Sequence, residues 1–373
     1  MHRINRKGRH VKQGSLRPAR KELEGLIPYD AKEVKADMLL SANENPLNLP
    51  KELQERIANH LDQFQFNRYP DGTAPRLRAL IAEANGLDSD NVLIGNGGDE
   101  LLMNMFLTWG GVGRKFMNFP PTFSMYENYA KITGTEVVSI PRDENFEIDQ
   151  EATRKRLAQG DIDLIILASP NNPTGNLTDE AFLLELLGCS DALVCVDEAY
   201  FEFSRTTVRP YLDRYPNLVI LRTFSKAFSL AALRVGYILA DTQVIREFLK
   251  VRQPYSVSAF SQWVAQVVYR DRALFETSIE ELVRGRAQII EGLSAIEGVK
   301  VFPSDANYVM FRMDHASIVW RDLFYNYSIY IRDFSRAPGL EGCLRVTVGT
   351  ESDNVAFIAA VREIVEREEA RNV

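Results

Sequence analysis

The sequence predicts an α/β protein with a large, doubly wound and mostly parallel sheet, followed by a smaller α/β domain. Strand and helix signals alternate from about residue 76 to residue 255, which is the pattern of a parallel sheet with helices on both faces. Several strand signals are continuous apolar runs, as strands buried on both faces require. After residue 255 come a long helical region, short strands and a terminal helix, which indicate a second, smaller domain.

Each expected element follows from its own pattern. In the first part, helices are expected at residues 74–83 and 180–187, a strand, glycine turn and helix at 91–102, and strands at 117–121, 135–140, 164–168, 192–196 and 217–221. In the second part, we expect a long helix around 279–293, strands at 299–301, 308–311 and 344–348, and a helix at 354–368. This organisation predicts an N-terminal arm (1–36), a large domain (50–255) and a small domain made of 37–49 and 256–373.

Composition narrows the function classes. The 373 residues are 45% hydrophobic and 25% charged, as in a globular protein with a large core. A net charge of −7 argues against a general nucleic-acid surface, and no segment approaches the ~20 apolar residues of a membrane span. Three cysteines fit free thiols in a reducing compartment, which favours the cytoplasm. Residues 1–21 are basic but lack the apolar core of a secretory signal, so we expect a basic arm. The four histidines lie outside every motif, so neither a metal site nor a histidine-based triad is expected.

Lys226 is nearly the only charge in an apolar and hydroxyl-rich stretch that follows the strand 217–221. Burial disfavours the ammonium form and lowers the pKa, which is what an amine needs to react with an aldehyde. Ser225 and Arg234 add a hydroxyl and a guanidinium, both of which commonly bind phosphate. A solvated turn at the end of an apolar strand is the alternative interpretation.

Asn172 lies in residues 169–175, a loop of Asn, Pro and Gly that directly follows the strand 164–168. Open α/β sheets bind ligands at the carboxyl ends of their strands, so the amide is a candidate to bind a planar polar group. An ordinary turn would use the same residue types. The closely spaced X-Pro bonds favour a cis peptide at Asn172–Pro173.

Asp197 follows the strand 192–196, and Tyr200 comes three residues later. A carboxylate at a strand tip can hold a proton on a heteroaromatic nitrogen, and a phenol can donate to a phenolate oxygen. A helix N-cap is the alternative role for such an aspartate.

Gly98 and Asp99 lie at a glycine-rich turn between a strand and a helix. Free backbone N–H groups and the helix dipole at such a turn bind phosphate without a basic side chain. Many turns of this composition are only tight turns.

Together these segments supply groups that only pyridoxal phosphate needs at once. They are a phosphate-binding set (Gly98, Asp99, Ser225 and Arg234), a pyridinium partner (Asp197), donors to a ring hydroxyl (Asn172 and Tyr200) and a Schiff-base lysine (Lys226). At these motifs the sequence resembles the fold type I pyridoxal-phosphate aminotransferases, and more narrowly the histidinol-phosphate aminotransferase family. The resemblance runs from about Tyr29 to the C-terminus and also rests on residues 42–46, 67–70, 97–100, 120–123 and 342–349.

The resemblance implies further roles. Phe123 matches an aromatic ring that stacks on the cofactor, where the family most often has tyrosine, so a role that needs a hydroxyl is not expected there. Tyr69 matches a tyrosine that reaches the cofactor phosphate of the neighbouring subunit, which implies a homodimer with shared sites. Arg345 and Arg332 match arginines that bind the anionic tail of the substrate, and Tyr29 matches a tyrosine near that tail.

The two arginines also stand out without the resemblance, because both lie in strand-like segments and a buried arginine needs an anion. A structural carboxylate satisfies that need as well as a substrate does. A guanidinium fits carboxylates and phosphates alike, so one pocket could accept both glutamate and a phosphate ester.

The implied activity is ping-pong transamination between L-histidinol phosphate (as imidazole-acetol phosphate) and glutamate/2-oxoglutarate, in histidine biosynthesis. Lys226 would act as the general base, and Asp197 would keep the cofactor nitrogen protonated. An aromatic or broad-range amino-acid aminotransferase and a threonine-phosphate-type decarboxylase share the scaffold. A catalytically silent cofactor-binding regulatory module is the non-enzyme alternative. The sequence leaves the preferred donor and acceptor open.

Overall fold

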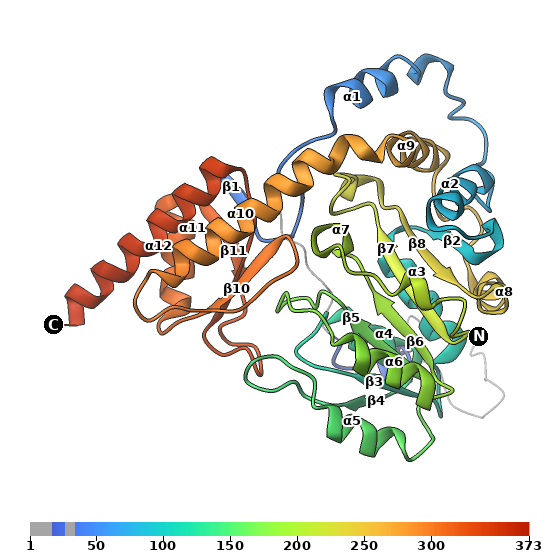
Figure 1. Ribbon diagram of the computed structural model, residues 1–373, viewed down its shortest axis with the longest axis horizontal. Coiled ribbons are helices and arrows are strands. Elements are labelled where there is room, and N and C mark those ends of the chain that lie inside the picture. The colour runs from blue at the N-terminus through green and yellow to red at the C-terminus, as the bar shows by residue number, and fades with distance from the viewer. Residues whose placement is uncertain (1–16, 27–33, 373) are drawn as a thin grey trace, which may run out of the picture.

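The molecule is built around two β-sheets (Figure 1). The structure is a computed structural model that describes residues 17–26 and 34–372. The larger sheet has seven strands in the order β2 (Val92–Gly95), β8 (Gly236–Ala240), β7 (Leu218–Thr223), β6 (Leu193–Asp197), β5 (Leu164–Ala168), β3 (Lys115–Asn118) and β4 (Glu136–Ser139). The smaller sheet has five strands in the order β1 (Met38–Leu40), β11 (Ile329–Asp333), β12 (Cys343–Thr347), β10 (Tyr308–Arg312) and β9 (Lys300–Val301).

The larger sheet is parallel except for β8, which runs antiparallel to both of its neighbours. Strands β5, β6 and β7 are buried at every position, as their continuous apolar runs predict. This confirms the predicted doubly wound, mostly parallel fold. Strand β8 was not predicted, because its short apolar run follows the Lys226 loop too closely to stand out as a separate element.

Helices cover both faces of this sheet. One face packs against α3 (Gly97–Trp109), α4 (Met125–Thr133) and α8 (Thr242–Val251). The other face packs against apolar residues of α1 (Lys51–Ala58), α2 (Pro75–Asn85), α5 (Gln150–Leu157), α6 (Glu180–Cys189), α7 (Phe201–Ser204), α9 (Ala259–Arg270) and α10 (Glu276–Ser294). Local capping sets several of these ends, and the Asp179 carboxylate accepts the Phe182 N–H at the start of α6.

The smaller sheet combines an N-terminal strand with C-terminal ones, since β1 pairs in parallel with β11. Helices α11 (Ala316–Tyr327) and α12 (Glu351–Asn372) pack with it, and α10 runs diagonally from this sheet toward α9 in Figure 1. Because β1 belongs to the smaller sheet and α1 packs on α9, residues 41–49 pass between the two halves of the molecule. Among the residues that the structure describes, no helix has the length and apolar character needed to cross a membrane.

Candidate active site

The loops after β5, β6 and β7 bring the predicted residues together at the carboxyl edge of the larger sheet. Lys226 lies three residues beyond β7, and Asp197 is the last residue of β6. The charges of Arg345, Arg234 and Asp99 all act on the Lys226 amine, so the small sheet and the start of α3 contribute to the same site. An edge where several parallel strands end is where open α/β sheets bind ligands.

Lys226 is half-buried, and its Nζ donates to the Ala42 carbonyl over 2.9 Å. Desolvation, followed by the positive charge of Arg345, lowers the pKa of the amine to about 8, while the negative charge of Glu44 opposes that shift. A pKa near 8 leaves a sizeable neutral fraction at physiological pH. Lys226 can therefore act as a nucleophile or a base.

Asp197 is buried, and the Tyr126 hydroxyl donates to its Oδ2 over 2.7 Å. The backbone N–H of Ala199 donates to Oδ1 over 3.1 Å. Desolvation raises the pKa of the carboxyl to about 6, although these two hydrogen bonds act in the opposite direction. A buried carboxylate whose charge is stabilised by these two hydrogen bonds alone is suited to pair with a cationic ring nitrogen.

The residues predicted to bind phosphate lie around the start of α3. The Arg234 guanidinium donates to Asp99 Oδ2 over 2.9 Å, and the Tyr129 hydroxyl donates to Oδ1 over 3.0 Å. Two glycines allow a close approach here. A Cβ on Gly97 would lie 2.7 Å from Arg234 Nη2, and one on Gly236 would lie 2.8 Å from the Gly97 carbonyl carbon. Strand β8 and the first turn of α3 therefore approach each other through their backbones, and the N–H groups of that turn have no partner within the helix.

Ser225 and Gly98 complete this set. Ser225 is buried directly before Lys226, and its hydroxyl accepts from Thr223 Oγ1 over 3.0 Å. Gly98 is the second residue of α3, where a helix has no intrahelical partner for its N–H. Phe123 packs edge to face on Tyr126 with ring centroids 5.5 Å apart, and Tyr126 in turn donates to Asp197.

Arg345 is buried in β12 and reaches the loop that carries Asn172. Its Nη1 donates to Asn172 Oδ1, and its Nη2 donates to the Ser41 carbonyl over 2.7 Å. This turns the donor end of the Asn172 amide away from Arg345. The peptide bond Asn172–Pro173 is cis, as predicted, and so are Ser169–Pro170 and Pro120–Pro121.

Within the described part of the chain, Tyr69 makes no contact with the other predicted site residues, and Arg332 is linked to the site through its strand partner Arg345 and the Phe334 ring. Arg332 is exposed on β11 and lies over the Phe334 ring, 5.6 Å from its centroid. Tyr69 is 84% exposed and stacks on Tyr255 with ring centroids 4.9 Å apart. Tyr29 lies outside the described residues.

Two residues at the site were given no role by the sequence. Tyr126 holds Asp197, and Asn43 donates from its Nδ2 to the Tyr200 hydroxyl oxygen over 2.9 Å. A phenol only three residues after Phe123 was the available signal for Tyr126. For Asn43, the signal was its place in the Asn-Glu-Asn-Pro motif, but that motif does not say which residue Asn43 contacts.

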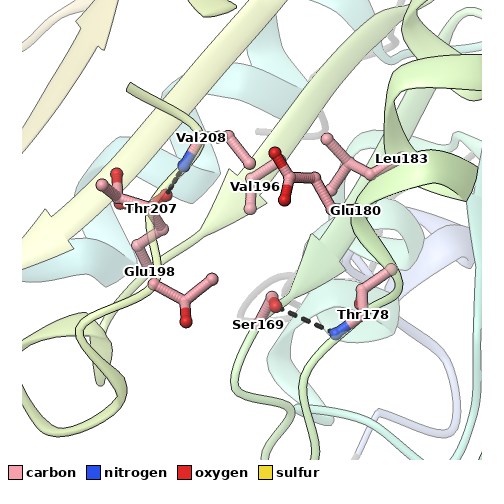
Figure 2. A pocket seen from close by; sticks show the side chains of 9 residues that line it. Ser169, Thr178, Glu180, Leu183, Val196, Glu198, Thr207 and Val208 are labelled. Atoms are coloured by element: carbon pink, nitrogen blue, oxygen red, sulfur yellow. Dashed lines mark hydrogen bonds between the residues drawn. The ribbon is translucent and has the colours of Figure 1, made fainter. Parts of the chain in front are cut away.

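A small pocket opens at the same edge of the sheet but on its other face (Figure 2). Asp197 points toward α4, whereas the next residue, Glu198, accepts a hydrogen bond from the Val208 N–H over 2.7 Å. The Glu198 carboxylate is also paired with Arg222 at 2.8 Å in the protein interior. Lys226 and Asp197 do not line this pocket, so it is separate from the candidate active site.

Comparisons with known proteins place this chain in a family. Residues 35–361 match the model of the family described as aminotransferase class I and II. The chain is 39% identical over 341 residues to histidinol-phosphate aminotransferase 1 of Carboxydothermus hydrogenoformans, covering 91% of this chain and 96% of that protein. It is 40% identical over 345 residues to the histidinol-phosphate aminotransferase of Thermococcus kodakarensis, covering 92% and 97%.

A solved structure agrees at the level of the fold. Histidinol-phosphate aminotransferase from Sinorhizobium meliloti, in complex with pyridoxal-5′-phosphate, superposes with a TM-score of 0.85 at 21% identity, covering 95% of this chain and 99% of that one. The predicted fold type is thereby confirmed. The chain belongs to the histidinol-phosphate aminotransferase family, within the pyridoxal-phosphate-dependent aminotransferases of class I and II.

Proposed function

We propose that this protein transfers an amino group between L-histidinol phosphate and 2-oxoglutarate, using the residues at the carboxyl edge of the larger sheet. The observation that carries the proposal is one site that holds a lysine with a pKa of about 8, a buried aspartate and a buried arginine. The relatives at 39% and 40% identity are named for this reaction, and this chain covers nearly their whole length. It therefore has the length and the groups for the complete reaction.

The residues present fit pyridoxal phosphate. Asp197 is a buried carboxyl whose pKa is raised to about 6 by desolvation, and a pyridinium nitrogen is the kind of partner that would lower it again. The first turn of α3, Ser225 and Arg234 offer N–H, hydroxyl and guanidinium donors for a phosphate. Tyr200 and Asn172 offer donors for a ring oxygen, and Phe123 offers a ring face. Lys226 would hold the aldehyde carbon.

When bound, the cofactor supplies a ring that withdraws electrons from the substrate's α-carbon. Lys226 in its neutral form would take the proton from the substrate's α-carbon and return it to the former aldehyde carbon of the cofactor. Asp197, fixed by Tyr126 and Ala199, holds a proton at the ring nitrogen. Tyr200 donates to the ring oxygen, and Arg345 and Arg332 bind the anionic end of the substrate.

The substrate's phosphate is the part that separates this reaction from its rivals. Arg332 and Arg345 are register partners on β11 and β12, so their side chains leave the same face of the smaller sheet. Two guanidinium groups on one face match the charge of a phosphate monoester better than that of a single carboxylate. An aromatic aminotransferase would need only one of them.

We further propose a homodimer with shared active sites. Tyr255 is 50% exposed and stacks on the exposed Tyr69, and Phe66, three residues before Tyr69 in the sequence, is 70% exposed. Such a concentration of exposed aromatic rings is typical of a protein interface. In the dimer, Tyr69 would reach the cofactor phosphate of the partner subunit. The proposed division into arm, large domain and small domain follows the predicted boundaries, and β1 lying in the smaller sheet supports it. The cytoplasm is the proposed location, supported by the three cysteines, which form no disulfide.

An assay of the purified holoenzyme with four substrates tests the proposed reaction. Histidinol phosphate, histidinol and phenylalanine are each offered with 2-oxoglutarate, and threonine phosphate is tested for release of carbon dioxide. We expect histidinol phosphate to have the largest kcat/KM, with glutamate as the product. A larger value for phenylalanine would identify an aromatic aminotransferase, and carbon dioxide release would identify a decarboxylase. No turnover with any of them would favour the silent regulatory module.

A further inference from the structure

Three side chains form a hydrogen-bonded chain from the smaller sheet to the candidate active site. Thr347 is the last residue of β12, Asn43 lies just after β1, and Tyr200 lies just after β6. Their exposed fractions are 2%, 2% and 5%. Water therefore does not compete for their hydrogen bonds, and each bond has to be satisfied within the protein.

The direction of each hydrogen bond in this chain is set by its neighbour. The backbone N–H of Asn43 donates to the Thr347 hydroxyl over 3.0 Å, so the hydroxyl proton has to point elsewhere. It points to Asn43 Oδ1, 3.2 Å away. Because Oδ1 is held by Thr347, the amide nitrogen of Asn43 faces Tyr200 and donates to its oxygen over 2.9 Å.

The Tyr200 oxygen thus accepts one hydrogen bond and still carries its own proton. Desolvation raises the pKa of Tyr200, so the phenol remains protonated at neutral pH. The hydroxyl proton rotates about the C–O bond, and the Asn43 amide excludes it from the side that the amide occupies. The Tyr200 hydroxyl can therefore donate its proton to an acceptor on the other side.

The backbone around Asn43 is held as firmly as its side chain. Asn43 has a left-handed φ of 55°, which asparagine tolerates better than most residues, and its carbonyl accepts from Asn307 Nδ2 over 3.1 Å. The two preceding carbonyls accept from Arg345 and Lys226. Residues 41–43 therefore contact the site at three consecutive positions.

We propose that Asn43 and Thr347 are positioning residues that aim the Tyr200 hydroxyl proton at the ring oxygen of the bound cofactor. The inference rests on the proposed function and adds to it a route by which the smaller sheet acts on the cofactor. A hydrogen-bond donor at that oxygen stabilises its anionic form and so lowers the pH at which the bound cofactor loses its proton. Breaking the hydrogen bonds that link Thr347, Asn43 and Tyr200 should therefore raise that pH.

A pH titration of the visible absorbance of the holoenzyme measures this effect directly. The midpoint does not depend on how much protein is loaded, so a partly unstable variant still gives a value. Tyr200→Phe serves as the reference, and we expect it to raise the midpoint by roughly one to two pH units, because a hydrogen bond to a charged group contributes about that much.

Two variants then test the hydrogen bonds of Thr347 and Asn43. Thr347→Val keeps the shape but releases the Asn43 amide, and Asn43→Asp replaces the donor to Tyr200 with an acceptor. Each is expected to raise the midpoint by about half a pH unit or more, in the direction of Tyr200→Phe. Thr347→Ser keeps the hydroxyl and should keep the wild-type midpoint.

The outcomes separate this inference from the proposed function. If Tyr200→Phe shifts the midpoint while Thr347→Val and Asn43→Asp leave it unchanged, the positioning role is overturned and the proposed function stands. If the wild-type protein shows no visible absorbance with pyridoxal phosphate, or Tyr200→Phe shifts nothing, the assignment of the cofactor site fails and this inference fails with it.

Discussion

Arg332 and Arg345 lie directly opposite each other on strands β11 and β12. Both guanidinium groups also contact one ring, that of Phe334, at 5.6 and 5.5 Å from its centroid. Like charges at directly opposed positions destabilise a pair of strands. An anion bound between the two guanidinium groups, such as the proposed substrate phosphate, would offset that repulsion.

Replacing the exposed member of this pair should change substrate choice. We expect Arg332→Gln to lower kcat/KM for histidinol phosphate about 10- to 100-fold, the loss expected for one charge-assisted hydrogen bond, and to change the value for phenylalanine only slightly. Steady-state kinetics with both donors measure the ratio. Arg321→Gln, at an exposed arginine on α11, is the matched control and should leave both values intact. Equal losses for the two donors would count against the phosphate as the ligand of Arg332.

The pH dependence of the rate of cofactor capture should report the protonation state of the Lys226 amine. Its pKa is lowered to about 8, first by desolvation and then by the charge of Arg345, so the neutral amine predominates above that pH. We expect the rate of cofactor capture by the apoenzyme, followed by stopped-flow absorbance, to rise about tenfold per pH unit below 8 and then level off.

Two controls give this profile its meaning. Lys226→Ala should show no capture and no turnover, and an active Lys226→Ala enzyme would refute the assignment of the lysine. A simple amine with an unshifted pKa should continue to react faster up to about pH 10. A protein whose profile follows that amine would have an unperturbed lysine, and the desolvation argument would be wrong.

Asp197 should make the apoprotein less stable at neutral pH than at acidic pH. Its pKa is about 6 in the folded protein, against a reference value of 3.8. Between these values the folded state binds more protons than the unfolded state, so stability falls as pH rises through that window. The loss amounts to at most about 3 kcal/mol, since a tenfold change in a proton-binding constant corresponds to about 1.4 kcal/mol.

Asp197→Asn removes this titration. Urea unfolding of the apoprotein should therefore find the variant more stable than wild type at pH 7.5, by up to about 3 kcal/mol, and find the difference reduced at pH 4.5. The same variant should have little transaminase activity, because an amide cannot hold the ring nitrogen protonated as a carboxylate does. If Asp197→Asn were less stable than wild type by the same amount at both pH values, burial would not raise the pKa of the Asp197 carboxyl in the wild-type apoprotein.

Much of this site could be predicted because its residues follow strands that are recognisable from local sequence. Asp197 and Lys226 stand directly after continuous apolar runs, and parallel strands bring their carboxyl ends to one edge. The turn before α3 that was predicted to bind phosphate is equally local. The positions of these residues in the fold could thus be predicted from the local pattern of each segment, together with the rule that parallel strands end at one edge of a sheet.

The rest depends on contacts between distant segments. Asn43 meets Tyr200 across 157 residues of sequence and Thr347 across 304, and no local pattern encodes such a meeting. The same holds for Tyr126, whose helix position looks like an ordinary apolar face until β6 places Asp197 against it. Residues 37–49 were predicted to belong to the small domain, but the three residues of β1 carry too little pattern to indicate that their partner is β11.

The buried ion pair between Glu198 and Arg222 should be structural. The two side chains are 1% and 3% exposed and lie 2.8 Å apart, and Glu198 lines the pocket that neither Lys226 nor Asp197 lines. We expect Glu198→Leu to destabilise the protein by about 3–5 kcal/mol in urea unfolding, because it leaves a buried arginine without its carboxylate. Below the unfolding midpoint, the visible absorbance of the bound cofactor should be retained.

An exposed ion pair provides the comparison. Arg205 and Glu276 are 53% and 51% exposed, so Glu276→Leu should cost less than about 1 kcal/mol. If Glu198→Leu abolished cofactor absorbance while the protein remained folded, the pair would belong to the active site after all.

Complementation between two defective variants tests the shared site. In the proposed dimer, each site takes Lys226 from one subunit and Tyr69 from the other. Tyr69 stands exposed beside Tyr255 and makes no contact with Lys226 within its own described chain. We therefore expect Lys226→Ala and Tyr69→Ala to be weak or inactive alone, and an equal mixture of the two, unfolded and refolded together, to regain activity.

The size of the recovery is set by how subunits combine. Random pairing makes half of the dimers mixed, and each mixed dimer holds one site with both residues intact, so about a quarter of the wild-type activity should return. Mixing Lys226→Ala with the double variant Lys226→Ala/Tyr69→Ala should recover nothing. If the first mixture also recovered nothing beyond the sum of its parts, while sedimentation showed mixed dimers, Tyr69 would have to act within its own subunit or not at all.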